Sequence, residues 1–193
     1  MTERTVVLVK PDGVKRGLIG EIISRFEKVG LKIVAMKMVW VDAGMVRKHY
    51  PASREEWVKM VGEKTLETYK KYGLDPGEKI GASNPKEIGL KVCEWLVDYL
   101  TSGPVVAMVL QGPHAISVVR KIAGHTYPEE AQAGTIRGDY SIDSTDIANE
   151  KKRSTRNLVH ASGNSEEAKF EEELWFHKNE IHSYKRSDED VIF

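Results

Sequence analysis

Residues 105–111 (VVAMVLQ) form an almost unbroken apolar run with a Gly-Pro pair on each side, at 103–104 and 112–113. A short apolar run bounded in this way predicts a strand that is buried on both faces. Residues 5–10 (TVVLVK) form a second run of this kind, and the turn residues 11–13 (PDG) end it. These two runs predict strands of a central sheet.

Helices are predicted between the strands. Leu18, Ile22, Phe26 and Val29 recur at the spacing of an amphipathic helix, which Gly30 closes. The other predicted elements are a strand at 32–41, a helix capped by Asp42 and ending near Tyr50, helices at 55–72, from Asn84-Pro85, at 115–123 and at 165–176, and a short strand at 158–160. This order predicts an α+β fold: a ferredoxin-like (split βαβ) sandwich with a four-stranded antiparallel sheet covered by helices.

The length of 193 residues predicts a single domain, 1–193. Between residues 51 and 85, glycines and prolines interrupt a helix-like pattern, which favours a surface insertion. Residues 125–156 have only scattered apolar side chains and predict a long irregular loop, and loops of this length are usually functional or flexible.

Composition excludes several classes of protein. Lys+Arg and Asp+Glu both number 29, so no net charge attracts nucleic acid or an anionic membrane. The longest apolar run, 105–110, is far shorter than the roughly 20 residues of a membrane-spanning helix. The single cysteine, Cys93, cannot form an intrachain disulfide. A cytoplasmic protein without a membrane or nucleic-acid partner is expected.

Common phosphate-binding motifs are missing, since the sequence has neither a P-loop nor a GxGxxG motif after a strand. Any phosphate site must therefore form without a glycine-rich cradle. Lys10 ends a strand, and Arg137 lies in a glycine-flanked loop that suits bidentate recognition of phosphate. Each of these cations taken alone is also typical of an ordinary surface.

Histidines at two places in the sequence suggest a catalytic or metal-binding role. His160 ends an apolar run and precedes small residues, a strand end from which the ring can face a cleft, although a half-buried structural histidine fits as well. His177 and His182, with Glu180 between them, suggest a metal site, but their spacing matches no common zinc pattern and a solvated tail is favoured.

Taken together, seven segments resemble the nucleoside diphosphate kinase family and occur in the order of that family. They are 9–14 (VKPDGV), 16–23 (RGLIGEII), 49–50 (HY), 102–109 (SGPVVAMV), 134–139 (GTIRGD), 157–162 (NLVHAS) and 174–177 (LWFH). They span nearly the whole chain outside two insertions, at 51–85 and 143–153. The second insertion is charged, and a solvated excursion is expected there.

The resemblance implies transfer of the γ-phosphoryl group from a nucleoside triphosphate such as ATP to a nucleoside diphosphate. The transfer would proceed by a ping-pong mechanism through a phosphohistidine on the pros nitrogen of His160. An imidazole is largely neutral near pH 7, so it attacks without surrendering a proton to a separate base.

The resemblance also implies a role for each matching residue. Phosphates would be bound by Lys10, Arg120, Thr126 and Arg137. Asn157 would contact the ribose, Tyr50 would orient the transferred group, and Glu171 with Ser162 would support the histidine.

Mg²⁺ would arrive on the nucleotide phosphates rather than on protein ligands. The family usually assembles as hexamers, so a homo-oligomer is expected. Val92 stands where the family has an aromatic platform for the base, and Leu96 keeps its expected type. Because a valine cannot stack as a ring does, base binding through Val92 is expected to be weaker, and Val92 and Leu96 also fit plain helix-core positions.

Two alternatives belong to other functional classes. A catalytically silent nucleotide-sensing module on the same fold would have little need to keep Lys10, Arg120, Arg137, Asn157 and His160 together. A single-stranded nucleic-acid binder would require aromatic RNA-recognition signatures and a basic face, and neither is present in the sequence.

Overall fold

The structure, a computed structural model, describes residues 2–192 and contains one four-stranded sheet. Its strands are β1 (Thr2–Val9), β2 (Lys32–Val39), β3 (Val105–Pro113) and β4 (Val159–Ala161), in the spatial order β2-β3-β1-β4. Every neighbouring pair is antiparallel. This order and pairing are those of a ferredoxin-like sheet, so the predicted fold class is confirmed.

Contacts divide the described chain into two compact units. We call residues 2–40, 103–141 and 157–192 the sheet unit, and residues 41–102 and 142–156 the helical unit. The sheet unit contains all four strands and the elements α1 (Pro11–Lys15), α2 (Ile19–Lys28), α7 (Ala115–Ala123), η1 (Pro128–Glu130), α8 (Ile136–Tyr140), α10 (Ser165–Trp175), η2 (Lys178–Glu180) and α11 (Glu189–Ile192). The helical unit contains α3 (Ala43–His49), α4 (Glu55–Lys71), α5 (Pro76–Ile80), α6 (Pro85–Thr101) and α9 (Thr145–Glu150).

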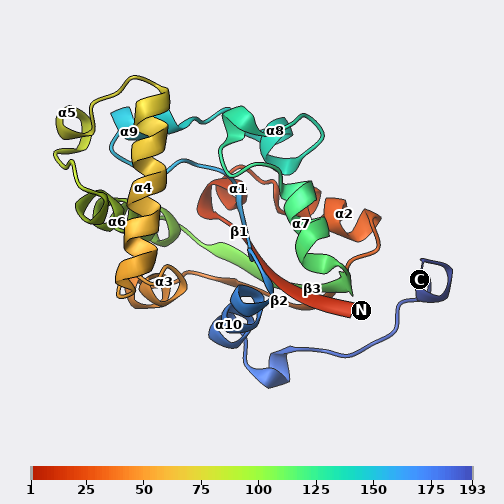
Figure 1. Cartoon of the computed structure of the whole chain (residues 1–193). Helices are drawn as coiled ribbons and strands as arrows, with labels where there is room; N and C mark the ends of the chain where they lie inside the picture. Colours follow the sequence, from red (N-terminus) through yellow and green to blue (C-terminus); the bar gives the residue numbers. More distant parts are fainter. Residues whose placement is uncertain (1, 193) are drawn as a thin grey trace. The chain divides into compact units, whose positions relative to one another are not determined.

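Helices cover both faces of the sheet. Val7 and Val9 of β1 lie in the main hydrophobic core with Ile22 of α2 and Val119 of α7. Side chains alternate along a strand, so Arg4 lies on the opposite face, where it pairs with Glu172 of α10 at 3.2 Å. The sheet therefore lies between α2 and α7 on one side and α10 on the other (Figure 1).

The C-terminal segment runs along the outer edge of β2. The backbone N–H of His182 donates to Val34 O at 2.8 Å, and the Tyr184 hydroxyl donates to Ile33 O at 2.8 Å. Ion pairs join Lys37 to Glu180 and Lys32 to Glu189. These contacts satisfy part of an edge strand that would otherwise present open hydrogen-bonding groups.

The helical unit has a core of its own. Tyr69, Ile80, Ala82 and Ile88 form a buried cluster, against which Val92 and other half-buried apolar side chains pack. The expected surface insertion at 51–85 therefore contributes buried core residues.

Gly62 does not interrupt the helix that contains it. It lies inside α4, where an added Cβ would stand 1.7 Å from the carbonyl oxygen of Pro85 at the start of α6. Gly89 of α6 meets the carbonyl oxygen of Val58 in the same way, at 2.0 Å. The prediction that glycine breaks this helix is wrong at Gly62, because here glycine allows two helices to pack closely.

Residues 125–156 are less irregular than expected. They contain η1, α8 and α9, each too short to leave a helical pattern of apolar residues in the sequence. The expected solvated excursion at 143–153 is only partly right: Asp146 and residues 150–152 are exposed, but Ala148 is buried and α9 contacts α5. The two ends of residues 143–153 are joined by an ion pair, in which Asp143 accepts two hydrogen bonds from the Arg153 guanidinium at 2.6 and 2.7 Å.

Among the described residues, the helices do not combine the length and the apolar character needed to cross a bilayer.

Packing at Gly62 yields a stability test. Gly62→Ala is expected to lower the free energy of unfolding by about 1–3 kcal/mol, because its Cβ overlaps the Pro85 carbonyl and forces α4 and α6 apart. Gly20→Ala is the matched control, since no atom lies within 4 Å of its Cβ position in α2. It is expected to stabilise by roughly 0.5–1 kcal/mol through helix propensity. Thermal and urea unfolding measure the free energy of unfolding of both variants. The same change in the two variants would contradict the close packing of α4 and α6 at Gly62.

Candidate active site

His160 lies at one end of a hydrogen-bonded chain whose other members, Glu171 and Ser162, are buried. Its Nε2 atom lies 2.8 Å from Glu171 Oε1, and Glu171 Oε2 accepts a hydrogen bond from Ser162 Oγ at 2.7 Å. Ser162 Oγ in turn accepts from the backbone N–H of Val6 at 3.1 Å. Because a carboxylate accepts on both oxygens, the Nε2 atom of His160 carries the proton and Nδ1 keeps its lone pair.

Two elements position this chain of contacts. β4 pairs with β1, which places His160 opposite Leu8. Asn164 caps α10 by accepting from the backbone N–H of Glu167, so the helix begins just after β4 and presents Glu171 to the histidine two turns later. Figure 1 shows α10 beside β1, the strand with which β4 pairs. Glu171 is 5% exposed, which limits competition by water for its oxygens.

Lys10 and Asn157 form the second part of the site. Lys10 Nζ donates to Asn157 Oδ1 at 2.7 Å, and Asn157 Nδ2 donates to the carbonyl oxygen of Thr126 at 2.8 Å. Lys10 is only 5% exposed. Its burial, together with the nearby positive charge of Arg137, lowers the pKa of Lys10 from 10.5 to about 7, while Asp12 opposes this shift.

Arg137 holds the backbone around the site. Its guanidinium donates to the carbonyl oxygens of Gly124, His125, Asn157 and Val159 at 2.7 to 3.3 Å. The arginine is 7% exposed, and its charge is therefore held rigidly within the sheet unit. The sequence predicted that the Arg137 side chain binds phosphate. It did not indicate that the guanidinium would donate to four backbone carbonyl groups.

The other predicted residues of the sheet unit are more exposed. Arg120 lies in the last turn of α7, and Thr126 follows that helix in the loop before η1. The structure thus brings His160, Glu171 and Ser162 into one hydrogen-bonded group, and Lys10, Asn157 and the Thr126 backbone into another.

The remaining predicted residues belong to the helical unit. Tyr50 follows α3 and stacks on Trp57, with ring centroids 6.2 Å apart. Val92 packs against the cluster around Tyr69, and Leu96 lies one turn later on α6 in a half-buried position.

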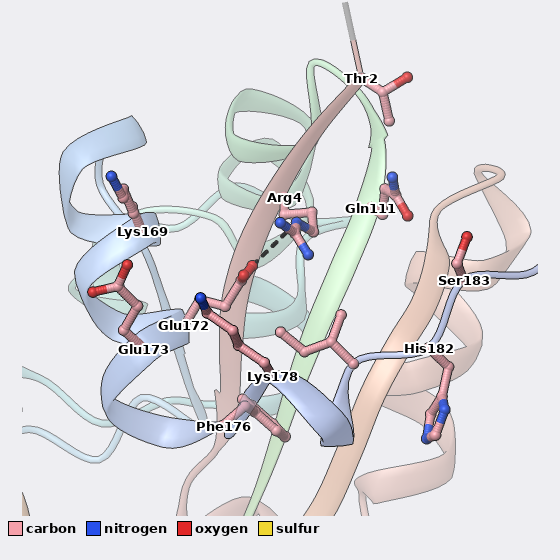
Figure 2. A pocket seen from close by; sticks show the side chains of 11 residues that line it. Thr2, Arg4, Gln111, Lys169, Glu172, Glu173, Phe176, Lys178, His182 and Ser183 are labelled. Atoms are coloured by element: carbon pink, nitrogen blue, oxygen red, sulfur yellow. Dashed lines mark ion pairs between the residues drawn. The ribbon is translucent and has the colours of Figure 1, made fainter.

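A separate pocket of about 790 Å³ lies on the α10 face of the sheet unit (Figure 2). Its wall includes the Arg4–Glu172 ion pair, and none of the residues predicted to act in catalysis or bind the nucleotide lines it. Consecutive residues of a helix point about 100° apart, which is why Glu171 faces His160 while Glu172 faces this pocket. His182 lines the pocket, and the Glu180 carboxylate between the two histidines binds Lys37 and the His177 backbone N–H.

Comparisons with known proteins give the family. The model of the family described as nucleoside diphosphate kinase matches residues 3–61 and 85–181. The nucleoside diphosphate kinase of Pyrobaculum aerophilum is 52% identical over 93% of this chain and 97% of that protein. The chain belongs to the nucleoside diphosphate kinase family. It is a phosphotransferase, and the resemblance seen in its sequence is confirmed.

Solved structures agree with this assignment. A crystal structure of an NDP kinase from Pyrobaculum aerophilum superposes with a TM-score of 0.91 and 49% identity, covering 95% of this chain and all of the other. A transition-state mimic of the nucleoside diphosphate kinase from Borrelia burgdorferi, with bound vanadate and ADP, has a TM-score of 0.77 and 39% identity and covers 98% and 96% of the two chains.

One residue of the site was missed. Asp12 was interpreted only as turn chemistry after the first strand, but its Oδ2 atom accepts from the backbone N–H of Leu158 at 3.2 Å. The two residues are 146 positions apart, so no local pattern links them. The one available signal was the position of Asp12 two residues after Lys10.

The shifted pKa of Lys10 predicts a pH-dependent stability. Between pH 7 and 10.5 the unfolded chain binds a proton at Lys10 that the folded chain has released, so this group makes folding more favourable as the pH rises through that window. Lys10→Met removes the titration. The free energy of unfolding of the variant is expected to exceed that of the wild type most near pH 7. This difference is expected to disappear towards pH 10.

Urea unfolding of both proteins across this range measures the difference. Lys121→Met, at an exposed position of α7, is the control and is expected to leave the pH profile unchanged. Parallel profiles for wild type and Lys10→Met would contradict the shifted pKa.

Proposed function

We propose that this chain transfers the γ-phosphoryl group of ATP or another nucleoside triphosphate to a nucleoside diphosphate through His160. The observation that carries the proposal is the contact between His160 Nε2 and Glu171, which leaves Nδ1 as the nucleophile. Membership of the nucleoside diphosphate kinase family supports the same assignment.

The reaction has two balanced half-reactions. In the first, Nδ1 of His160 attacks the γ-phosphorus, the bond to the bridging oxygen breaks, and the nucleoside diphosphate leaves. In the second, a terminal phosphate oxygen of another nucleoside diphosphate attacks the phosphohistidine and the P–N bond breaks. Glu171 keeps the proton on Nε2 in both steps, and a buried carboxylate stabilises the positive charge that develops on the phosphorylated ring.

Cationic groups stabilise the transferred charge in this proposal. Lys10 and Arg120 contact the phosphates together with the Thr126 hydroxyl, and the fixed charge of Arg137 adds to their field. Binding of an anion beside Lys10 favours its protonated form, because the phosphate charge offsets the burial that lowers its pKa.

The remaining nucleotide contacts in this proposal are those that the family resemblance assigns. Asn157 binds the ribose, Tyr50 orients the transferred group, and Val92 with Leu96 lies beside the base. Because Val92 is committed to packing with the cluster around Tyr69, its contact with the base is smaller than that of a stacked ring.

Mg²⁺ fits the site as a companion of the nucleotide. Lys10 lies near the positive charge of Arg137, and the carboxylates of Asp12 and Glu171 already accept protein hydrogen bonds. The ion would therefore be held by phosphate oxygens and water, where it neutralises charge on the transferred group.

The two units belong to one nucleoside diphosphate kinase domain in this proposal, with insertions near 51–85 and 143–153. The family match supports it, since residues 3–61 and 85–181 include segments of both units. A cytoplasmic location without a nucleic-acid partner stays a prediction from the sequence.

Phosphorylation of His160 can be tested directly. Brief incubation with ATP and Mg²⁺ is expected to add one acid-labile phosphoryl group to the wild-type chain, and a second nucleoside diphosphate is expected to remove it. Intact-mass and peptide mass spectrometry measure the adduct. His160→Ala is expected to take up none, whereas the exposed His177→Ala is expected to behave as wild type. Nucleotide binding without phosphoryl uptake by the wild type would leave the silent sensing module as the better explanation.

We also propose a homo-oligomer, with the hexamer of the family as the expected form. Met36 and Met38 on the edge strand β2, and Trp40 just after it, are 54%, 57% and 66% exposed. Their alternation puts three large apolar side chains on one face of an edge strand, and exposed patches of this kind mark protein interfaces.

Charges on this strand are expected to break the assembly. Met36→Glu/Met38→Glu places two carboxylates in the apolar patch, and the particle mass in multi-angle light scattering is expected to fall. Met60→Glu, an exposed methionine of α4, is the control and is expected to keep the wild-type mass. An unchanged mass for the double variant would exclude this patch as the interface.

A further inference from the structure

The backbone at Leu158 has a conformation that a leucine rarely adopts. Its φ is 68°, in the left-handed region where a side chain is strained. The N–H of Val159 donates to the carbonyl oxygen of Asn157 at 2.7 Å, which closes a three-residue turn around Leu158. A γ-turn with a positive central φ is a rare and strained structure. It lies two residues before His160.

This turn changes which way the strand faces. In an extended chain, residues 158 and 160 would point to the same side of the sheet. Instead Leu158 and Val159 are both fully buried in the main hydrophobic core, and His160 points to the opposite side, towards Glu171. The turn therefore anchors the chain in the core and still directs Asn157 to Lys10 and His160 to Glu171.

Three groups hold the strained turn in place. The Asp12 carboxylate accepts from the N–H of Leu158 at 3.2 Å, and the backbone N–H of Lys10 donates to the carbonyl oxygen of Leu158 at 2.8 Å. Arg137 donates to the carbonyl oxygens on either side, those of Asn157 and Val159. Strained backbone persists only where its surroundings determine it several times over.

Close packing brings Asp12 to this place. A Cβ on Gly13 would stand 3.2 Å from the Leu158 carbonyl oxygen and 2.9 Å from Val9 Cγ1, so glycine at this position lets the start of α1 approach the turn. Asp12, the preceding residue, then reaches the Leu158 N–H.

We propose that Asp12 is a positioning residue for phosphoryl transfer, and that it acts by holding the strained turn at Leu158 that aims Asn157 and His160. The inference rests on the proposed role of His160 as the nucleophile. Asp12 acts through the Leu158 N–H and not through the nucleotide. Its loss should therefore slow the chemical step more than it weakens substrate binding.

The first test compares two substitutions of Asp12. Asp12→Ala removes the acceptor and is expected to slow phosphoryl uptake by His160 about 10- to 100-fold, since a misplacement of about 1 Å can cost 100-fold. Asp12→Asn keeps an acceptor oxygen of the same shape and is expected to recover most of the rate. KM for the nucleotide is expected to change little in either variant. Rapid-quench kinetics with ATP and Mg²⁺ measure these rates.

A pH profile separates this role from an effect on Lys10. Asp12 also raises the pKa of Lys10, so the competing explanation is that its loss acts by discharging that lysine. In that case Asp12→Asn would be as slow as Asp12→Ala, and lowering the pH from about 8.5 to about 6 would restore both. This result would overturn the inference. A loss in Asp12→Ala that is equal across this range supports it.

A double-mutant cycle tests the strain itself. Leu158→Gly and Leu158→Ala leave cavities of nearly the same size, but only glycine adopts a positive φ without strain. Asp12→Ala is therefore expected to slow phosphoryl uptake less in the Leu158→Gly background than in the Leu158→Ala background. Equal losses in the two backgrounds would overturn the inference. If either Leu158 variant fails to fold, the rates and pH profiles of Asp12→Ala and Asp12→Asn still test the positioning role of Asp12.

Failure of the proposed function would look different. If the wild type takes up no phosphoryl group on His160, the proposed nucleophile is wrong. If the wild type is phosphorylated there and Asp12→Ala is phosphorylated equally fast, the nucleophile stands and only the positioning role falls.

Discussion

The pairing of β1 with β4 is the interaction on which the arrangement of the site depends. β4 has three residues, and a ladder this short is marginal by itself. The hydrogen bond from the Lys10 N–H to Leu158 O extends the pairing at one end, and the bonds between Val6 and Ser162 extend it at the other. Lys10, at the end of β1, and His160, in the middle of β4, are thereby held on one rigid frame.

The electrostatics of the site oppose the stability of the fold. Lys10 and Arg137 are both nearly buried, and the positive charge of Arg137 is one reason why the pKa of Lys10 falls to about 7. Keeping Lys10 charged beside the buried Arg137 costs free energy, and Asp12 offsets only part of that cost. A phosphate group is the ligand that such a site favours. The same positive charges that lower the stability of the fold therefore favour binding of a phosphate, as is common in strained or charged active sites.

Backbone geometry contributes as much to the site as side-chain chemistry. Arg137 was expected to bind phosphate, yet most of its donors hold carbonyl groups, and Asp12 was expected only to form a turn. Both residues support the segment that carries Asn157 and His160. Contacts of this kind cannot be predicted from sequence spacing, because a carbonyl oxygen has the same chemistry at every position of the chain.

The sequence by itself determined the strands, most helices and the family. Apolar runs such as 105–111 and caps such as Asn84 act over a few residues, so their patterns are visible in the chain, and the segment order then identified the family. Only the tertiary structure decided that Gly62 is a helix contact, that residues 143–153 are partly buried, and that Asp12 holds Leu158. These features depend on which distant groups meet, and in a folded chain packing decides that, not local propensity.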